Sequence, residues 1–323
     1  MKKCTAIGMS VELLNEPPAF IKPSTSEPSP IAATPIATFS EGKVPVVDWV
    51  TMISYVKQNL SKEPDFIPMI GVRLTELQRF QLGLNKLLNY SWPQKNHTVV
   101  AEVDNKQKVV DFYILYILHV AQLMVCSESM MKLSLDDRFS MFKHFWINFQ
   151  QIERLFITCQ IRGYDINDTV VFLDKENMID MAASTFTMCP MSEEEKKRYY
   201  ELNVPLVKLY FTYISTPFKL LKTTQMELAF IAILILWDVR EVKNLSSDAV
   251  QLANEVIDKV SLEMHQYYTS EMRNPIYSDR ITKLTKIAHD VQRLSQDRRN
   301  LTTMAQMFNL FNTDLSDNEL LMD

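Results

Sequence analysis

Glycine is scarce in this sequence: only five occur in 323 residues, and none follows Gly163. Loops that cradle phosphate groups need glycine, because the backbone must approach the ligand closely. Neither GxGxxG nor a Walker-type motif occurs anywhere in the chain. We therefore do not expect a nucleotide-dependent enzyme of the usual kinds.

Cysteine and histidine are too few and too scattered for the common chemistry of sites. The four cysteines, Cys4, Cys126, Cys159 and Cys189, include no CxxC pair, and the five histidines form no HExxH or HxH set. Nothing pairs a nucleophile with a base in the sequence. We therefore expect no structural disulfide, no metal site and no enzyme, and the composition favours a reducing intracellular compartment.

A charge excess and long apolar runs are missing as well. The formal net charge is -5 with both signs interspersed, so the chain alone is not expected to bind nucleic acid. The most apolar segments are 109–125, which carries Asp111 and His119, and 226–237, which is too short to cross a bilayer. Both are predicted to be buried helices, and no membrane association is expected.

The N-terminal part is rich in proline, since residues 15–45 hold seven of the 14 prolines, with serine and threonine between them. Such a composition cannot bury enough apolar surface to offset the entropy of ordering, so residues 10–45 are predicted to be a flexible linker. From 46 to 323 the apolar residues recur with a helical period, which predicts one all-α domain. Helices are expected at 46–59, 73–89, 105–128, 135–160, 175–184, 192–215, 223–237, 246–270, 278–311 and 317–322, with a short extended piece around 161–173.

The expected helix at 135–160 changes character along its length. Its apolar residues first advance by three or four positions, as on one face of an amphipathic helix. From about Phe145 onward, apolar residues lie on nearly every side. A helix of this kind must be covered by other helices on opposite sides. It is therefore predicted to form the middle of a three-layer stack.

The stretch "LSLDDRFSMFKHFW" (133–146) resembles the signature of nuclear-receptor ligand-binding domains. The signature places hold Leu135, Asp137, Arg138, Met141, Phe142, Lys143 and Trp146. Likewise, "TTQMELAFIAILILW" (223–237) is similar to the eighth helix of that family, and 278–311 with the short tail fits its last helices. The resemblance implies a three-layer antiparallel helical sandwich of about ten to twelve helices. The divergence looks like that of invertebrate receptors related to hepatocyte nuclear factor 4.

Residues 2–9 ("KKCTAIGM") look like the end of a receptor DNA-binding domain, where KCxxxGM follows the last zinc ligand. In that motif Cys4 is not a zinc ligand, and the zinc modules are absent from this chain. Residues 1–9 are thus predicted to be a remnant, and DNA would be bound only through an upstream zinc-finger domain. A fragment, an internal start and a receptor that lost its DNA-binding domain all stay open.

The resemblance also implies a groove for coregulators. In the family, a C-terminal helix docks over the pocket and completes a groove for a partner's LxxLL helix. A glutamate meets the first amides of that helix, and lysines meet its last carbonyls. The implied groove residues here are Lys143, Glu319, Leu320 and Leu321. The position of the second lysine holds Val125, and two alternatives stay open: Glu319 caps its own helix together with Ser316, and Lys143 is an ordinary solvated lysine.

A pocket for an apolar small molecule or lipid is implied between the helices 105–128, 145–160 and 278–311. Its expected liners are Tyr116, Val120, Leu123, Met124, Phe149, Ile152, Met304 and Met307. Methionine, of which the chain has 18, suits an adaptable apolar cavity. Arg154 and Arg162 are the nearest candidates to anchor a carboxylate, but neither is a strong one. The same liners would also suit a filled core.

The resemblance therefore predicts a ligand-regulated or orphan nuclear receptor, which controls transcription in the nucleus and binds coactivator or corepressor peptides. No cofactor is expected in this chain beyond the possible ligand. A homo- or heterodimer is implied at Leu284, Ile287, Val291 and Leu294, although such a stripe is also common in an ordinary core. The competing hypothesis is a ligand-independent helical scaffold or heterodimer partner.

Overall fold

The computed structural model describes residues 37–38, 46–64, 74–100, 103, 105–183 and 192–307, all within a unit that spans Ile36–Asp323. A separate unit, Met1–Pro35, lies outside the described residues. The predicted DNA-binding remnant, most of the predicted linker and the last predicted helix therefore lie outside them too.

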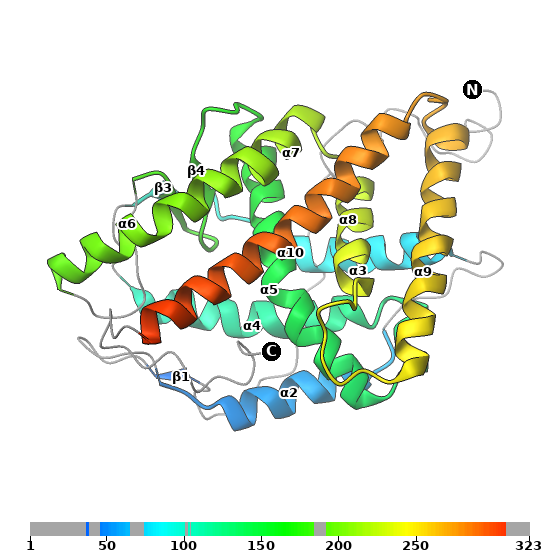
Figure 1. Ribbon diagram of the computed structural model, residues 1–323, viewed down its shortest axis with the longest axis horizontal. Coiled ribbons are helices and arrows are strands. Elements are labelled where there is room, and N and C mark those ends of the chain that lie inside the picture. The colour runs from blue at the N-terminus through cyan, green and yellow to red at the C-terminus, as the bar shows by residue number, and fades with distance from the viewer. Residues whose placement is uncertain are drawn as a thin grey trace. The chain divides into compact units, whose positions relative to one another are not determined.

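Helices dominate the described part of the chain, and Figure 1 labels them. They are α2 (Trp49–Ser61), α3 (Glu76–Ser91), α4 (Lys106–Met124), α5 (Leu135–Arg162), α6 (Glu193–Tyr210), α7 (Thr216–Leu221), α8 (Gln225–Trp237), α9 (Ser247–Gln266) and α10 (Ser278–Met307). Shorter helical turns are η2 (Glu128–Lys132), η3 (Phe211–Ser215) and η4 (Tyr267–Glu271). Within these ranges, no helix combines the length and the apolarity needed to cross a bilayer.

The helices of this unit form three layers, and α5 lies in the middle one with α8 and α9. One outer layer contains α3 and α4, and the other contains α6, α7 and α10 (Figure 1). Every side chain of α5 from Met141 to Cys159 is at least partly buried. The predicted all-α sandwich and its central helix are therefore confirmed, and their cause is the apolar surface that α5 carries on all sides.

Local signals in the sequence set the ends of α5. The Oγ of Ser134 accepts a hydrogen bond from the backbone N–H of Asp137 at 3.1 Å, which satisfies one free donor of the first turn. The helix ends at Gly163, whose φ of 88° lies in the region that favours glycine. Gly163, one of the few glycines of the chain, thus marks the end of α5.

The predicted helix at 175–184 is wrong. Strand β5 (Asn177–Asp180) lies there and pairs antiparallel with β4 (Val170–Phe172) and parallel with β3 (Thr98–Val99). The carboxylate of Asp174 accepts hydrogen bonds from the backbone N–H groups of Glu176 and Asn177, both at 2.7 Å. This Asx turn reverses the chain at the start of the segment 175–184, whose apolar spacing predicts a helix. The extended piece expected around 161–173 is confirmed only at its end, in β4.

A second small sheet precedes α2. Strand β1 (Ala37–Thr38) pairs antiparallel with β2 (Val46–Val47), so part of the predicted 10–45 linker is paired. The helix predicted from 46 begins instead at Trp49, because the side chain of Asp48 caps it by accepting from the Thr51 N–H at 3.1 Å.

Gly83 lets α3 approach the end of α4 closely. A Cβ atom added at Gly83 would lie 2.5 Å from Cys126 Sγ and 2.9 Å from Cys126 Cβ, which is too close. Gly83→Ala is therefore expected to destabilise the protein by about 1–2 kcal/mol, because overpacking outweighs the better helix propensity of alanine. Chemical denaturation would measure this, and Gly83→Ala combined with Cys126→Ala should recover part of the loss. A stabilised single variant would contradict the close contact.

Candidate functional site

The predicted groove lysine lies at the edge of an apolar surface between α4 and α5. Lys143 is partly buried, and its Nζ lies 5.8 Å from the centre of the Phe139 ring. Phe139 is 5% exposed, and Phe142, one turn further along α5, is fully buried. Val125, which stands where the family has its second lysine, is buried at the C-terminal end of α4. The end of α4 and the start of α5 thus provide an apolar floor with Lys143 at its rim.

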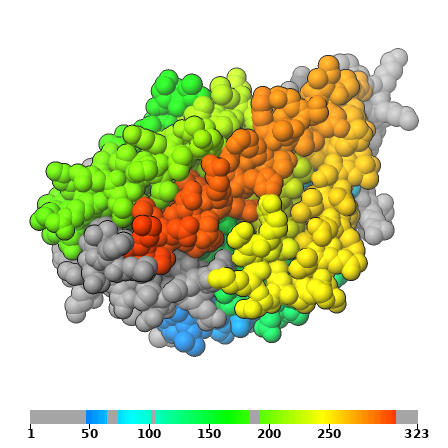
Figure 2. Space-filling model, in the orientation of Figure 1, coloured from blue at the N-terminus to red at the C-terminus, as the bar shows by residue number. Residues whose placement is uncertain are grey.

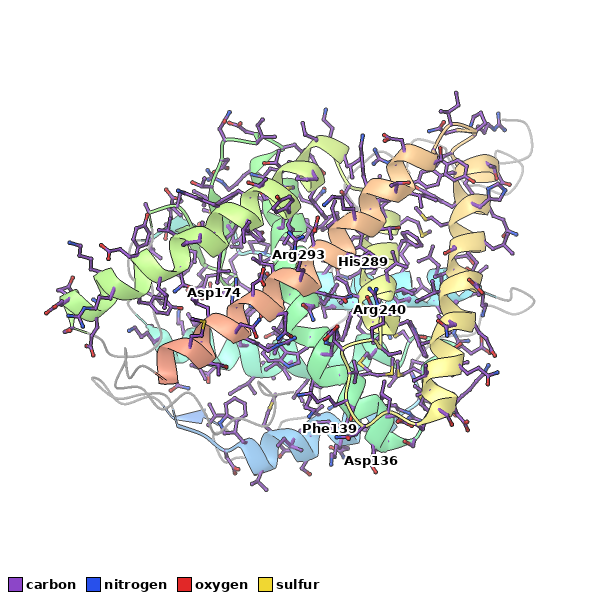
Figure 3. All side chains as sticks on the ribbon, in the orientation of Figure 1. Asp136, Phe139, Asp174, Arg240, His289 and Arg293 are labelled. Atoms are coloured by element: carbon purple, nitrogen blue, oxygen red, sulfur yellow. The ribbon has the colours of Figure 1, made fainter. Side chains whose placement is uncertain are left out.

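This floor is covered by α2, which packs against both α4 and α5 (Figure 1). Lys57 of α2 places its Nζ 4.7 Å from the centre of the Phe139 ring, a cation–π contact. Phe139 lies where α5 meets α2 (Figure 3). In addition, Nε2 of Gln122 near the end of α4 donates to Oδ1 of Asn59 at 3.0 Å. The surface predicted to take a partner helix therefore already carries a helix of this chain.

Arg138 holds the end of that covering helix. Its Nη1 donates to the Leu60 carbonyl in the last turn of α2 at 2.8 Å, and its Nε and Nη2 donate to the Leu133 and Met131 carbonyls at 3.0 and 2.9 Å. Burial lowers the pKa of Arg138 from its ordinary value. A cation at the carbonyl end of a helix is favourable. The sequence placed Arg138 in the signature but gave no sign of this contact, since Leu60 is 78 positions away.

The neighbouring signature residue, Asp137, connects α5 to α9. Its Oδ1 accepts from the backbone N–H of Ser246 and its Oδ2 accepts from the Ser246 hydroxyl, both at 2.9 Å. Burial alone would raise the pKa of Asp137, but the hydrogen bonds from Ser246 and Ser134 hold it below its ordinary value. The Asp137–Arg138 pair thus fixes both α9 and α2 to the start of α5. The other predicted groove residues, Glu319, Leu320 and Leu321, lie outside the described residues.

Six of the predicted pocket residues lie together in the interior. Tyr116, Val120, Leu123, Met124, Phe149 and Ile152 are all buried, on the facing helices α4 and α5. Met304 does not join them, because it is 54% exposed in the last turns of α10. Met307 ends α10, and its side chain lies outside what the structure describes. Both a filled core and an enclosed pocket require burial, so ligand binding is the property that separates them.

A polar cluster that the sequence did not reveal borders these residues. Glu153 accepts two hydrogen bonds from Arg154, from Nε and Nη2, both at 2.6 Å. It also accepts from the Ser91 hydroxyl at 2.5 Å and from the Tyr116 hydroxyl at 3.3 Å. Burial raises the pKa of Tyr116, and the neighbouring Glu153 carboxylate raises it further. The cluster joins α3, α4 and α5 in the interior.

Neither arginine considered as a carboxylate anchor is available for that role. Arg154 is neutralised by Glu153, and both side chains are buried. Arg162 forms a bidentate contact with Asp168 at 2.7 and 3.1 Å near the surface. A ligand carboxylate would have to displace an existing partner in either case, so the described interior suits an apolar ligand better than an anionic one.

The predicted dimerisation stripe on α10 is buried within the chain itself. Leu284, Ile287, Val291 and Leu294 are each at most 3% exposed and belong to the core. These four residues therefore do not offer a surface for a partner, and the prediction that they dimerise is corrected: they are ordinary core. Figure 2 shows α10 crossing one face of the molecule beside α6.

The exposed face of α10 is polar. His289 lies in hydrogen-bonding contact with Nη2 of Arg240 at 2.9 Å (Figure 3). Lys286 Nζ and Arg293 Cζ each lie 5.1 Å from the centre of the Tyr213 ring. A dimer contact through the exposed face of α10 would therefore meet mostly polar side chains and not the apolar stripe.

The comparisons with known proteins agree with this architecture. Residues 94–308 match the sequence model of the ligand-binding domain of nuclear hormone receptor. Similar proteins from Caenorhabditis elegans include nuclear hormone receptor family member nhr-213, 17% identical over 85% of this chain and 66% of its own length. Family member nhr-59 is 35% identical over 25% of this chain and 20% of its own length, and family member nhr-90 is 20% identical over 100% and 82%.

A mostly helical three-layer domain with this match is a receptor domain of a known class. The chain belongs to the family of nuclear hormone receptor ligand-binding domains. The relatives are invertebrate receptors, as the divergence predicted. The family consists of transcription-regulating receptors that are generally not enzymes. This chain spans less than two thirds of the length of nhr-213 and nhr-59.

Proposed function

We infer that this domain regulates transcription in the nucleus by binding a coregulator helix in the groove between the end of α4 and the start of α5. The observation that supports this function is the position of Lys143 at the rim of an apolar floor on which a helix already packs. The floor supplies apolar contact, and the lysine supplies a positive charge for the carbonyl end of a bound helix. Coactivator or corepressor peptides with an LxxLL-type motif are the expected partners.

Charge reversal of the groove lysine tests this proposal. Lys143→Glu is expected to weaken the binding of an LxxLL peptide about three- to thirtyfold, because a favourable contact with the helix dipole becomes a repulsive one. Fluorescence anisotropy of a labelled peptide would measure the affinity. Lys197→Glu is the matched control, since Lys197 is exposed on α6, which belongs to the opposite outer layer. Equal affinities for both variants and the wild type would contradict the groove.

The ligand of the domain is proposed to be an apolar small molecule or a lipid. The buried liners on α4 and α5 are apolar apart from the Tyr116 hydroxyl, and Arg154 is already neutralised by Glu153. Native mass spectrometry of the purified chain should show a co-purified lipid, or a hydrophobic compound should raise the melting temperature.

The alternative is a ligand-independent scaffold or heterodimer partner, and the close packing of aromatic rings favours it. Phe149 stacks on Phe145 with ring centres 5.1 Å apart, and Phe145 meets Phe80 of α3 edge to face at 6.5 Å. Rings that fill the space between layers leave a scaffold stable without a ligand. Absence of both lipid and ligand-induced stabilisation, with the peptide still bound, would support this alternative.

A further inference from the structure

The helix α2 precedes the residues that match the sequence model of the family. It spans Trp49–Ser61, whereas the match begins at residue 94. The two helices that it covers, α4 and α5, both lie inside the match. A helix that precedes the matched residues therefore occupies the surface to which the proposed function assigns the coregulator.

The sequence of α2 has the spacing of a coregulator motif. Met52, Tyr55 and Val56 stand at the first, fourth and fifth places of the pentapeptide "MISYV", where an LxxLL motif has its leucines. Met52 and Val56 are completely buried, and Tyr55 packs against the core. One further turn along, Leu60 is completely buried as well. Apolar anchors at this spacing are what a helix needs to bind in a groove.

The opposite face of α2 is turned to solvent. Val50 is 82% exposed, and Ser54 and Gln58, which follow at intervals of four residues, are exposed too. The helix is thus bound through one face only. It has 13 residues, and isolated helices of this length are marginal in water, so its order depends on the groove beneath it.

Polar contacts hold α2 as the family groove would hold a partner. Arg138 donates to the Leu60 carbonyl at 2.8 Å, which places a cation at the carbonyl end of the helix. The resemblance places at Val125 the lysine that would perform this task for a partner, and Arg138 performs it for α2. Lys57 adds its contact with Phe139, next to Lys143.

We propose that α2 is a built-in substitute for the coregulator helix, which occupies the groove around Lys143 and must leave before a partner can bind. This inference rests on the proposed function. A tethered helix competes at an effective concentration of about 1 mM, which is set by its linker. The apparent affinity for a partner is the intrinsic affinity multiplied by the fraction of molecules in which the groove is free. The occupied groove is therefore a closed state, and release of α2 opens it.

The central experiment compares two valine-to-aspartate variants on opposite faces of α2. Val56→Asp places a charge at a completely buried anchor, whereas Val50→Asp places the same charge on the exposed face. The probe is a fluorescein-labelled peptide with one LxxLL motif, titrated with the full chain. Val56→Asp is expected to bind it at least about tenfold more tightly than the wild type, and Val50→Asp is expected to bind like the wild type.

Three further measurements identify the site. Lys143→Glu added to Val56→Asp should abolish the gain. A peptide of residues 46–62 should displace the probe from Val56→Asp. In the wild type, saturating probe should speed hydrogen exchange in α2 while α5 stays protected, and this last readout needs no variant to fold.

The outcomes separate the two proposals. If the wild type binds the probe as tightly as Val56→Asp, with α2 still protected, the substitute role is overturned while the groove stands. If neither protein binds the probe although α5 stays protected, the groove is overturned and the substitute role with it. A gain that survives Lys143→Glu would place the peptide elsewhere and overturn the inference.

Discussion

Replacing Glu153 by glutamine is expected to lower the free energy of unfolding by about 3–5 kcal/mol, because the buried guanidinium of Arg154 would lose its counter-charge. Apart from the uncharged side chain at position 153, Arg154 contacts the Ser91 carbonyl at 3.4 Å, and among the described residues its Nη1 has no acceptor. A loss of this size is a large part of the stability of a typical domain, about 5–15 kcal/mol. Urea denaturation followed by circular dichroism would measure it.

A surface pair provides the control for this variant. Asp279→Asn removes the partner of Lys283, whose Nζ lies 2.6 Å away on the exposed face of α10, and should cost less than about 1 kcal/mol. Glu153→Leu combined with Arg154→Met should recover much of the loss, since two apolar side chains replace a paired charge. If Glu153→Gln behaved like Asp279→Asn, the interior placement of the pair would be wrong.

The layered fold could be predicted because its cause is local in the sequence. The apolar residues of α5 surround the helix from about Phe145 onward, and those of α8 do so along its whole length, so both had to be covered on several sides. The predicted start of α5 at 135 agrees with the structure, and the helix ends at Arg162, two residues beyond the predicted end. The strand at 177–180 could not be predicted in the same way, because the side chain of Asp174 overrides a short helical period.

Several features of the site could not be predicted, because they depend on contacts between segments that are distant in the sequence. Lys143 could be named from the signature, but the covering of its groove could not, because the amphipathic pattern of α2 does not say which surface it meets. Glu153 and Arg154 are adjacent in the sequence, yet their burial depends on Ser91 from α3 and Tyr116 from α4. The apolar stripe that begins at Leu284 was predicted to be a dimer interface. The same helical period also fits a buried core, and the structure places the stripe in the core.

The charge network at the start of α8 connects three segments. Glu227 accepts hydrogen bonds from Nε and Nη2 of Arg280 in α10, the latter at 2.7 Å, and from the Tyr268 hydroxyl of η4. It also closes the capping box by accepting from the Thr224 N–H at 2.8 Å. Burial alone would raise the pKa of Glu227, but the contacts with Arg280, Thr224 and Tyr268 lower it below its ordinary value.

Glu227→Gln is therefore expected to cost about 2–3 kcal/mol at pH 7, since hydrogen bonds to a charged group are lost while Arg280 keeps some access to water. The pKa of Glu227 in the folded state is depressed, so its contribution is fully present above the unfolded pKa of about 4.3 and is lost as the pH falls through the folded value. Denaturation at pH 7 and at pH 3.5 would show the wild type losing more stability than the variant. A difference between the two proteins that did not shrink in acid would contradict the role of the charge.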